Sequence, residues 1–373
     1  MNIAEVLKKR DPHVTEELSG LLNKKVPVII AGAGNLGKKI ASFLLKKNID
    51  IFSFTDNNLN RRGETILGKT IFTPSEISQQ LKEAAVWIVS IWSPGHSYSE
   101  TTKQLQQSGV KNIFSGATLM QLYPGELLPH YHFQTPDFYL QHKQEITEVF
   151  ENLADEESKR QFLAHADARI NLNFEGLPKA DISNQYFPSG VVSLGTEEVF
   201  LDAGAFDGDT LKEFVNRTGT KFSKYIALEP DPANYEKLLK VASQYPKDLV
   251  EVFPYAVGAE NTTLKFNATG GGGAGFSETG TTVVECKKID DVFFKYKPTY
   301  LKFDIEGAEL DALKGAQKTI EAYKPKLAVC IYHLPQDIWQ IFLFLRQKFS
   351  FYKFYVRTHQ YDGLDFVLYA IPQ

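Results

Sequence analysis

Acidic residues directly follow several short apolar runs in the C-terminal half of the sequence. Asp202 follows VFL, Glu229 follows YIAL, and Asp304 follows YLKF. Runs of this kind predict buried strands, and open α/β sheets bind their ligands beyond the carboxyl ends of the strands. We therefore expect these three carboxylates on the ligand-binding edge of one sheet.

The turn after the first of these strands, DAGAFDGDT at residues 202–210, has the composition of a ligand loop. Gly204 and Gly208 allow the backbone to approach a ligand closely, because no Cβ intervenes. A dinucleotide requires an unobstructed helix N-terminus for its phosphates, whereas this loop carries Asp202, Asp207 and Asp209. It suits a ligand that bears a sulfonium and an ammonium group. The alternative is a plain strand-turn-helix with capping aspartates.

The other strand ends add a ribose acceptor and groups that could move a proton. Glu229 can accept hydrogen bonds from both hydroxyls of a ribose, although an acid at a helix start is also favoured by the helix dipole. Asp304, Glu306 and His333 follow two later strands, and a hydroxyl nucleophile needs such a group to take its proton. His333 could instead be a capping or core histidine. Glu306, and Glu309 still more, could lie in a solvated first helical turn. The same side chains could hold a divalent cation, but their spacing is no metal signature, and we expect no metal.

The elements that must position these residues form two successive α/β blocks. Apolar runs alternate with helical periodicity, which predicts parallel sheets. In the first block the predicted strands are 26–31, 51–55, 85–90 and 112–114, with helices at 35–47 and 97–108. In the second they are 198–202, 224–229, 249–257, 299–304 and 326–332, with helices at 209–217, 231–243, 307–322 and 335–348. The closing residues 349–372 predict an antiparallel hairpin. We expect an N-terminal Rossmann-like domain at 1–123, a helical bridge at 124–190 and the second domain at 191–373.

The motifs of the second block, taken in order, resemble those of the FkbM family of methyltransferases. The similar segments are DAGAFDGDT, ALEPDPANY, KFDIEGAE, IYHLPQDIW and the closing hairpin, within about 191–373. The resemblance implies a class I methyltransferase fold, with a seven-stranded sheet and a terminal antiparallel hairpin. It also implies S-adenosylmethionine as the methyl donor and O-methylation of a hydroxyl on a sugar, nucleotide sugar or polysaccharide. The donor-binding residues that it implies are Asp202, Gly204, Ala205, Asp207, Gly208, Thr210, Glu229 and Asn234, and the catalytic ones are Asp304, Glu306 and His333. The loop Gly270–Gly275 is either a lid over the acceptor or a surface loop.

The first block carries its own nucleotide signature. Gly32-Ala-Gly-Asn-Leu-Gly37 is a G-x-G-x-x-G segment between a strand and a helix, with Gly34 at its centre. Asp56 follows at nearly the spacing of a ribose-binding acid. The ligand could be a nucleotide-linked sugar, because residues 25–120 resemble N-terminal domains of sugar-modifying enzymes, and this domain could then present the sugar to the methyltransferase site. It could also be NAD(P), or the glycines could serve only tight packing.

Composition restricts the remaining possibilities. A formal net charge of −4 gives no electrostatic case for nucleic acid. Cys286 and Cys330 are the only cysteines, which fits a reducing compartment. We expect neither a signal peptide nor a membrane span, and hence a cytoplasmic protein with a small-molecule or glycan acceptor, compatible with a homo-oligomer. The alternatives are an NAD-dependent sugar oxidoreductase or epimerase with an accessory domain, and a non-catalytic nucleotide-binding protein.

Overall fold

The computed structural model describes residues 2–8, 12–267, 275–276 and 280–373, and its chain divides into two compact units. Unit 1 contains the described residues up to Thr147, together with Arg160–Ala180 and Gln360–Leu364. Unit 2 contains Glu148–Lys159, Asp181–His359 and Asp365–Gln373. The residues predicted to form a helical bridge, 124–190, are thus shared between the two units, and the unit boundaries fall inside helices α9 (Lys143–Glu151) and α10 (Glu156–Asn171).

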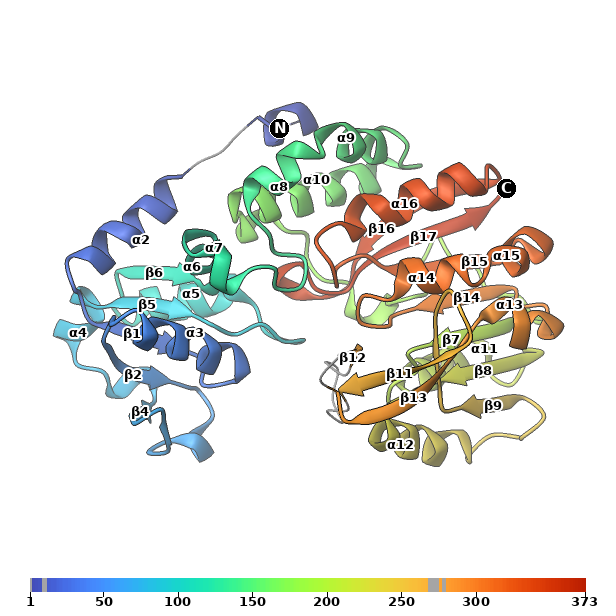
Figure 1. Cartoon of the computed structure of the whole chain (residues 1–373), viewed down its shortest axis with the longest axis horizontal. Coiled ribbons are helices and arrows are strands. Elements are labelled where there is room, and N and C mark those ends of the chain that lie inside the picture. Colours follow the sequence, from blue (N-terminus) through green and yellow to red (C-terminus); the bar gives the residue numbers. More distant parts are fainter. Residues whose placement is uncertain (1, 9–11, 268–274, 277–279) are drawn as a thin grey trace. The chain divides into compact units, whose positions relative to one another are not determined.

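Unit 1 is built on a six-stranded sheet with the order β3-β4-β2-β1-β5-β6 (Figure 1). Its strands are β1 (Val28–Ala31), β2 (Ile51–Thr55), β3 (Thr65–Ile66), β4 (Lys69–Phe72), β5 (Val86–Val89) and β6 (Asn112–Ser115). All neighbours run parallel except β3 and β4. This order confirms the predicted Rossmann-like fold. The β3–β4 pair was not predicted from the sequence, because its short strands offer too few residues for a periodic pattern.

Helices cover both faces of this sheet because its central strands are apolar on both sides. Val28 and Ile30 of β1 face one core, and Ile29 and Ala31 face the other, as expected when side chains alternate along a strand. The first core includes side chains of α2 (His13–Asn23), α3 (Asn35–Lys46) and α6 (Gly116–Leu122). The second includes those of α4 (Gln79–Ala84) and α5 (Tyr98–Gln107). The remaining helices in this part of the chain are α1 (Ile3–Val6), α7 (Pro124–Leu127) and α8 (Pro136–Gln141).

Unit 2 contains the predicted seven-stranded sheet, with the order β16-β17-β15-β14-β7-β8-β9. Its strands are β7 (Val199–Ala203), β8 (Lys224–Leu228), β9 (Val250–Phe253), β14 (Tyr300–Phe303), β15 (Lys326–Cys330), β16 (Tyr352–Thr358) and β17 (Phe366–Pro372). Only β17 runs antiparallel to its neighbours, between β15 and β16. This arrangement confirms the class I methyltransferase fold with its terminal hairpin. The carboxyl ends of β7, β8, β14 and β15 therefore share one edge.

The helices of unit 2 lie in the crossovers between these strands. They are α11 (Asp209–Thr218), α12 (Pro232–Ala242), α13 (Ile289–Val292), α14 (Glu309–Lys314), α15 (Gln317–Tyr323) and α16 (Asp337–Lys348). The prediction of one helix over 307–322 is wrong, because the chain breaks between α14 and α15. Gly315 at the break packs on the Gly258 carbonyl, and a Cβ there would lie 2.0 Å from that oxygen.

The predicted strand 249–257 is also two strands rather than one. Pro254 separates β9 from β10 (Tyr255–Val257), because proline has no N–H to donate to a sheet. β10 joins a second sheet of order β10-β13-β11-β12, with β11 (Thr262–Asn267), β12 (Gly275–Phe276) and β13 (Thr282–Lys287). Residues 270–274 of the glycine-rich loop lie outside the described residues, so its role as a lid stays a prediction.

Candidate active site

The glycine turn after β7 is held directly against the end of β14. Gly204 has φ of +82°, and a Cβ on it would lie 1.9 Å from the Asp304 carbonyl oxygen. Only glycine therefore fits this position. The N–H groups of Gly204 and Ala205 both donate to the Leu228 carbonyl at 3.0 Å, which ties the turn to β8. Gly208, with φ of +88°, donates to the Ala205 carbonyl at 2.9 Å and starts α11.

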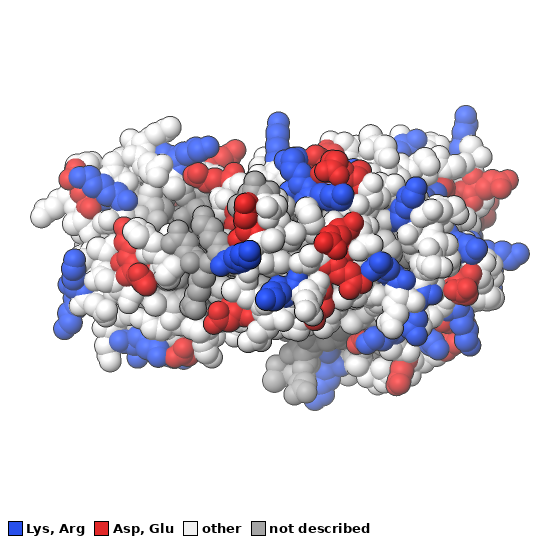
Figure 2. Space-filling model, turned by 90° about the horizontal axis from the view of Figure 1, so that it is seen from above, with Lys and Arg blue, Asp and Glu red and all other residues white. Residues whose placement is uncertain are grey.

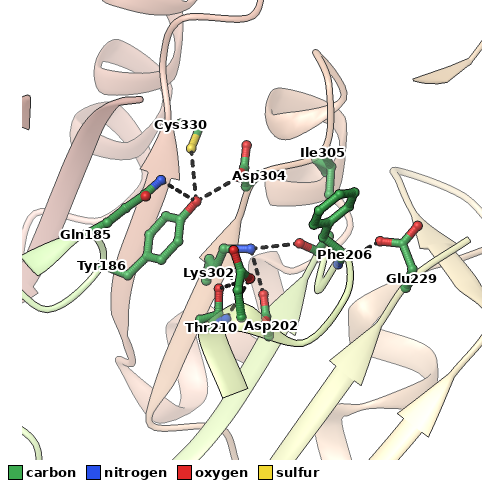
Figure 3. A network of polar contacts seen from close by, with 12 residues as sticks. Gln185, Tyr186, Asp202, Phe206, Thr210, Glu229, Lys302, Asp304, Ile305 and Cys330 are labelled. Carbon is green, nitrogen blue, oxygen red and sulfur yellow. Dashed lines mark hydrogen bonds and ion pairs between the residues drawn. The ribbon is translucent and has the colours of Figure 1, made fainter. Parts of the chain in front are cut away.

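Glu229 lies at the end of β8 beside this turn, buried, with each carboxylate oxygen on one backbone N–H. Oε2 accepts from the Phe206 N–H at 2.9 Å (Figure 3). Oε1 accepts from the Asp231 N–H at 2.9 Å. Burial raises the pKa of Glu229 to about 7, against the lowering effect of these two donors. Each oxygen keeps a lone pair for a further donor, so the geometry suits a pair of ribose hydroxyls.

Asp202 is fully buried, and both of its oxygens are already occupied by protein groups. Lys302 of β14 pairs with Oδ1 at 2.7 Å, and the Tyr225 hydroxyl donates to Oδ2 at 2.5 Å. Lys302 also donates to the Gly204 carbonyl at 2.8 Å (Figure 3). This arrangement gives Asp202 the task of anchoring the glycine turn. Direct contact between Asp202 and a donor stays a prediction.

The other predicted donor residues lie around the same turn. Asp207 is half-buried, and Thr210 is buried with its N–H on the Asp209 carboxylate at 2.6 Å. Asn234, on α12, is buried, and its Oδ1 accepts from Lys237 at 3.0 Å. The same Lys237 ammonium lies 5.6 Å from the centre of the Phe206 ring. The predicted residues thus flank the ends of β7 and β8.

The predicted catalytic residues come together at the ends of β14 and β15. His333 Nε2 lies 3.4 Å from Asp304 Oδ1 and 3.8 Å from Glu306 Oε1. His333 is buried, and its Nδ1 is 2.8 Å from Glu309 Oε1. Because Glu309 fixes the imidazole through Nδ1, the Nε2 side is directed at the two other carboxylates. The structure thus brings His333 together with the two other predicted catalytic residues, and its catalytic role stays a prediction.

Glu309 overturns the expectation of a solvated first helical turn, since its side chain is fully buried. The chain reverses at Glu306 and Gly307, which have φ of +54° and +98°, and this turn directs the start of α14 back toward β15. As a result the Glu309 carboxylate accepts the Ile305 N–H at 2.9 Å as well as contacting His333. Nothing in the sequence pattern signals the left-handed turn at Glu306.

The charged groups around His333 shift one another's pKa values. Burial alone would lower the pKa of His333, but Glu309, Glu306 and Asp304 outweigh it and raise that pKa to about 10. Loss of solvation raises the pKa of Glu306 to about 8. Burial opposes the charge on Asp304 too, yet Lys302 and His333 hold the pKa of Asp304 below its ordinary value. At neutral pH the site therefore presents an Asp304 carboxylate beside a His333 imidazolium.

The glycine loop of unit 1 combines close packing with an open helix start. A Cβ on Gly32 would lie 2.4 Å from an Ile91 carbon, and one on Gly37 would lie 2.0 Å from the Gly32 carbonyl oxygen. A Cβ added to Gly34, in contrast, would meet no atom within 4 Å, and no side chain caps α3 there. Asp56 turns toward this loop and accepts the Ala33 N–H at 3.3 Å. Two of the three glycines thus serve packing, and the third leaves the helix N-terminus accessible.

The described part of the chain offers neither a metal-binding cluster nor a membrane-spanning helix. Within residues 2–8, 12–267, 275–276 and 280–373, no three His, Cys, Asp or Glu side chains are arranged to hold a metal ion. None of the helices in these ranges combines the length and apolar character that crossing a bilayer requires.

Fold and site together define a class I methyltransferase unit accompanied by a second, Rossmann-like unit. Residues 202–358 match the methyltransferase FkbM domain, so the predicted resemblance is confirmed for this part of the chain, and unit 2 carries an FkbM-type methyltransferase domain. A solved structure of methyltransferase FkbM from Methylobacillus flagellatus KT is similar at 20% identity and a TM-score of 0.79, over 96% of this chain and 97% of that one. At this identity the likeness shows the fold.

Unit 1 matches a different set of proteins from unit 2. Residues 23–112 match the C2185-like N-terminal domain. The redox-sensing transcriptional repressor Rex of Pelotomaculum thermopropionicum is 26% identical over 118 residues, which cover 31% of this chain and 55% of that protein. Rex of Roseiflexus sp. is 31% identical over 113 residues, covering 30% and 51%. The chain spans about half the length of these curated relatives, and the predicted relation to sugar-modifying enzymes stays a prediction.

Proposed function

We propose that unit 2 transfers a methyl group from S-adenosylmethionine to a hydroxyl of a sugar-type acceptor. The observation that carries this proposal is that one edge of the sheet holds two carboxylates, one suited to accept hydrogen bonds from ribose hydroxyls and one suited to accept a proton. Glu229 provides the first through two oxygens held on backbone N–H groups, and Asp304 provides the second. The FkbM domain match supports the same chemistry.

The residues of the glycine turn fit the donor. Gly204 packs directly against the Asp304 carbonyl and carries no side chain that would stand between the backbone and a ligand. Asp207 and Asp209 place carboxylates, not cations, at the start of α11. Such a turn disfavours phosphates and favours a cationic ligand. When bound, S-adenosylmethionine would supply an electrophilic methyl group on a sulfonium. Glu229 would hold its ribose, with Phe206 and Asn234 beside it.

Asp304 rather than His333 would act as the base. The raised pKa of His333, about 10, keeps the imidazole protonated at neutral pH, so it has no lone pair for a proton. Asp304 is ionised, and its Oδ1, which lies 3.4 Å from His333 Nε2, would take the proton that the acceptor hydroxyl loses as the new C–O bond forms and the methyl–sulfur bond breaks. His333 would keep Oδ1 in place. Glu306, with a pKa of about 8, would be largely protonated and able to donate to the acceptor.

For unit 1 we propose a nucleotide ligand. The open N-terminus of α3 at Gly34, the Asp56 carboxylate beside the loop and the similarity to Rex proteins support it. Both a nucleotide sugar and NAD carry the pyrophosphate that such a terminus binds. An oxidoreductase or epimerase activity has no support beyond this loop, and a non-catalytic protein does not explain the ordered groups at Asp304.

The setting that we propose is cytoplasmic, with a glycan or small-molecule acceptor. Both cysteines are free thiols in buried positions, in keeping with a reducing compartment. On the face seen in Figure 2, Lys and Arg side chains lie interspersed with Asp and Glu among the described residues. Such mixed charge gives no basis for a nucleic-acid partner.

The decisive experiment measures donor binding and turnover in Asp304→Asn. We expect calorimetry to show that the variant binds S-adenosylhomocysteine as the unchanged protein does, because Asp304 does not hold the ribose. Methyl transfer from S-adenosylmethionine to a panel of methyl glycosides and uridine diphosphate sugars should fall by roughly 10²- to 10⁴-fold, as expected for loss of a general base. An unchanged protein that binds no S-adenosylhomocysteine would remove the proposal.

A further inference from the structure

Tyr186 reaches the catalytic cluster from a segment that precedes the whole sheet of unit 2. It follows a short 3₁₀ turn at Ile182–Asn184 and lies before β7, outside the matched residues 202–358. Its side chain is buried, and it points at the end of β14 in Figure 3. Neither the domain match nor the sequence motifs assign it a role.

The backbone of Tyr186 is held in a conformation that costs free energy. Its φ is +65°, which is uncommon for a residue with a Cβ and persists only where the surroundings enforce it. The Tyr186 N–H donates to the Tyr369 hydroxyl at 3.1 Å, and the Tyr300 hydroxyl donates to the Tyr186 carbonyl. Tyr369 is in turn bonded to His359 at 2.7 Å. Two strands of the sheet, β14 and β17, thus hold the Tyr186 backbone.

The two oxygens of Asp304 have different partners, because the Tyr186 hydroxyl bonds only one of them. It donates to Asp304 Oδ2 at 2.7 Å and accepts from Gln185 at 3.0 Å (Figure 3). The other oxygen, Oδ1, faces His333 at 3.4 Å. Burial raises the pKa of Tyr186 well above its ordinary value, so the phenol remains a donor. The Lys302 ammonium lies 4.8 Å from the centre of the Tyr186 ring.

We propose that Tyr186 is a positioning residue, which fixes the orientation of the Asp304 carboxylate so that Oδ1 alone is presented to the acceptor hydroxyl. This inference rests on the proposed role of Asp304 as the base. A carboxylate that rotates freely would offer either oxygen at a varying angle. The hydrogen bond from the Tyr186 hydroxyl to Oδ2 stops this rotation. Because the Tyr186 backbone is held in place, the phenol stays directed at Asp304.

Asp304 also responds to several other charged or titratable groups, which remain in place when the phenol is changed. They are Lys302 on β14, His333 and Cys330 at the end of β15, and Tyr332, Glu306 and Asp365. Because a hydrogen bond to a carboxylate favours its charged form, removing the Tyr186 donor alone should make Asp304 easier to protonate.

The test is Tyr186→Phe, which keeps the ring and the backbone contacts and removes only the hydroxyl. Carboxyl-¹³C aspartate spectra, assigned with Asp304→Asn, should show the Asp304 titration moving to higher pH. The affinity for S-adenosylhomocysteine should stay within about twofold. With the sugar that the unchanged protein methylates, kcat should fall roughly ten- to a hundredfold, the range of one bond to a charged group, with a smaller change in KM. The acidic limb of the kcat profile should move upward together with the titration.

Tyr352→Phe is the matched control. Tyr352 is another buried tyrosine of unit 2, and its hydroxyl donates to the Pro325 carbonyl at 2.6 Å, at the opposite edge of the sheet. It should leave the Asp304 titration and kcat unchanged. An unshifted titration in Tyr186→Phe, or a loss of folding there but not in Tyr352→Phe, would overturn the positioning role. If the unchanged protein neither binds S-adenosylhomocysteine nor methylates any sugar, the proposed function fails, while the titration still decides the role of Tyr186.

Discussion

Three carboxylates lie at or next to the carboxyl ends of three neighbouring strands of unit 2, and each has different partners. Asp202 is neutralised by a buried lysine, so it stabilises the turn. Each Glu229 oxygen accepts one backbone N–H and keeps a lone pair, so the carboxylate can accept from hydroxyl donors when it is ionised. Asp304 has one oxygen on a phenol and the other beside an imidazolium. Carboxylates at or near three strand ends thus have different partners, which in our proposal suit them to anchoring, binding and proton transfer.

The raised pKa of Glu229 predicts a pH-dependent donor affinity. Ribose hydroxyls donate best to the ionised carboxylate, so binding should weaken as pH falls below about 7, by up to roughly tenfold per unit. Calorimetry with S-adenosylhomocysteine from pH 5.5 to 8 measures this. Glu229→Gln should weaken binding at pH 8 and remove the dependence. A constant affinity in the unchanged protein would contradict the assignment.

The same group has an opposite effect on the stability of the free protein. A carboxyl group whose pKa is about 7 in the fold but near 4.5 when unfolded binds more protons in the folded state between these values. The free energy of unfolding should therefore fall as pH rises from 4.5 to 7. Urea denaturation at pH 5 and 8 should show a smaller difference in Glu229→Gln than in the unchanged protein.

The Lys302–Asp202 pair predicts a large cost when one charge is removed alone. Both side chains are at most 2% exposed and 2.7 Å apart. Lys302→Met should destabilise the protein by about 3–5 kcal/mol, because Asp202 is left buried without a counter-charge. The double variant with Asp202→Asn should recover part of this loss. Chemical denaturation measures each value, and equal stabilities of the two variants would argue against a coupled pair.

At the scale of elements, the strand ends were predictable and the groups between them were not. Short apolar runs ending in acids predicted that Asp202, Glu229 and Asp304 lie near one edge of the sheet, and they are found at or next to the ends of β7, β8 and β14, because parallel strands bring their carboxyl ends to one edge. Lys302 was missed because a lysine in an apolar strand normally faces solvent. Tyr186 was missed because it lies in an irregular segment whose contacts arise only after the sheet has formed.

The contact between the β7 turn and the β14 end predicts an unusual cost for Gly204→Ala. The new Cβ would meet the Asp304 carbonyl oxygen at 1.9 Å, so both strand ends must move. We expect loss of S-adenosylhomocysteine binding and a destabilisation well above the backbone strain of about 1–3 kcal/mol. Gly219→Ala is the control, since Gly219 also has a positive φ, +61°, with no atom within 4 Å of the added carbon. It should show the strain alone and bind normally.

At the scale of the whole molecule, two α/β units carry two different kinds of helix start. In unit 2, α11 begins among aspartates, whereas in unit 1 the first turn of α3 has no acid and no side-chain cap. Anions are stabilised only at the second kind. The two units should therefore bind chemically distinct ligands, a cationic donor in unit 2 and a pyrophosphate-bearing nucleotide in unit 1.

This difference predicts that one substitution separates the two ligands. Gly34 has φ of −77° and open space around it, so Gly34→Asp should fold normally and even cap α3. Its carboxylate would repel a pyrophosphate at the same N–H groups. At a hundredfold excess over Kd, a ligand stabilises the fold that binds it by about 2.7 kcal/mol. Thermal denaturation with NADH or uridine diphosphate glucose should show such a stabilisation in the unchanged protein and none in Gly34→Asp.

S-adenosylhomocysteine is the control ligand, and it should stabilise both proteins alike. A nucleotide shift that survives the substitution would place the nucleotide elsewhere, and no shift with either nucleotide would leave the glycines of unit 1 a packing role alone.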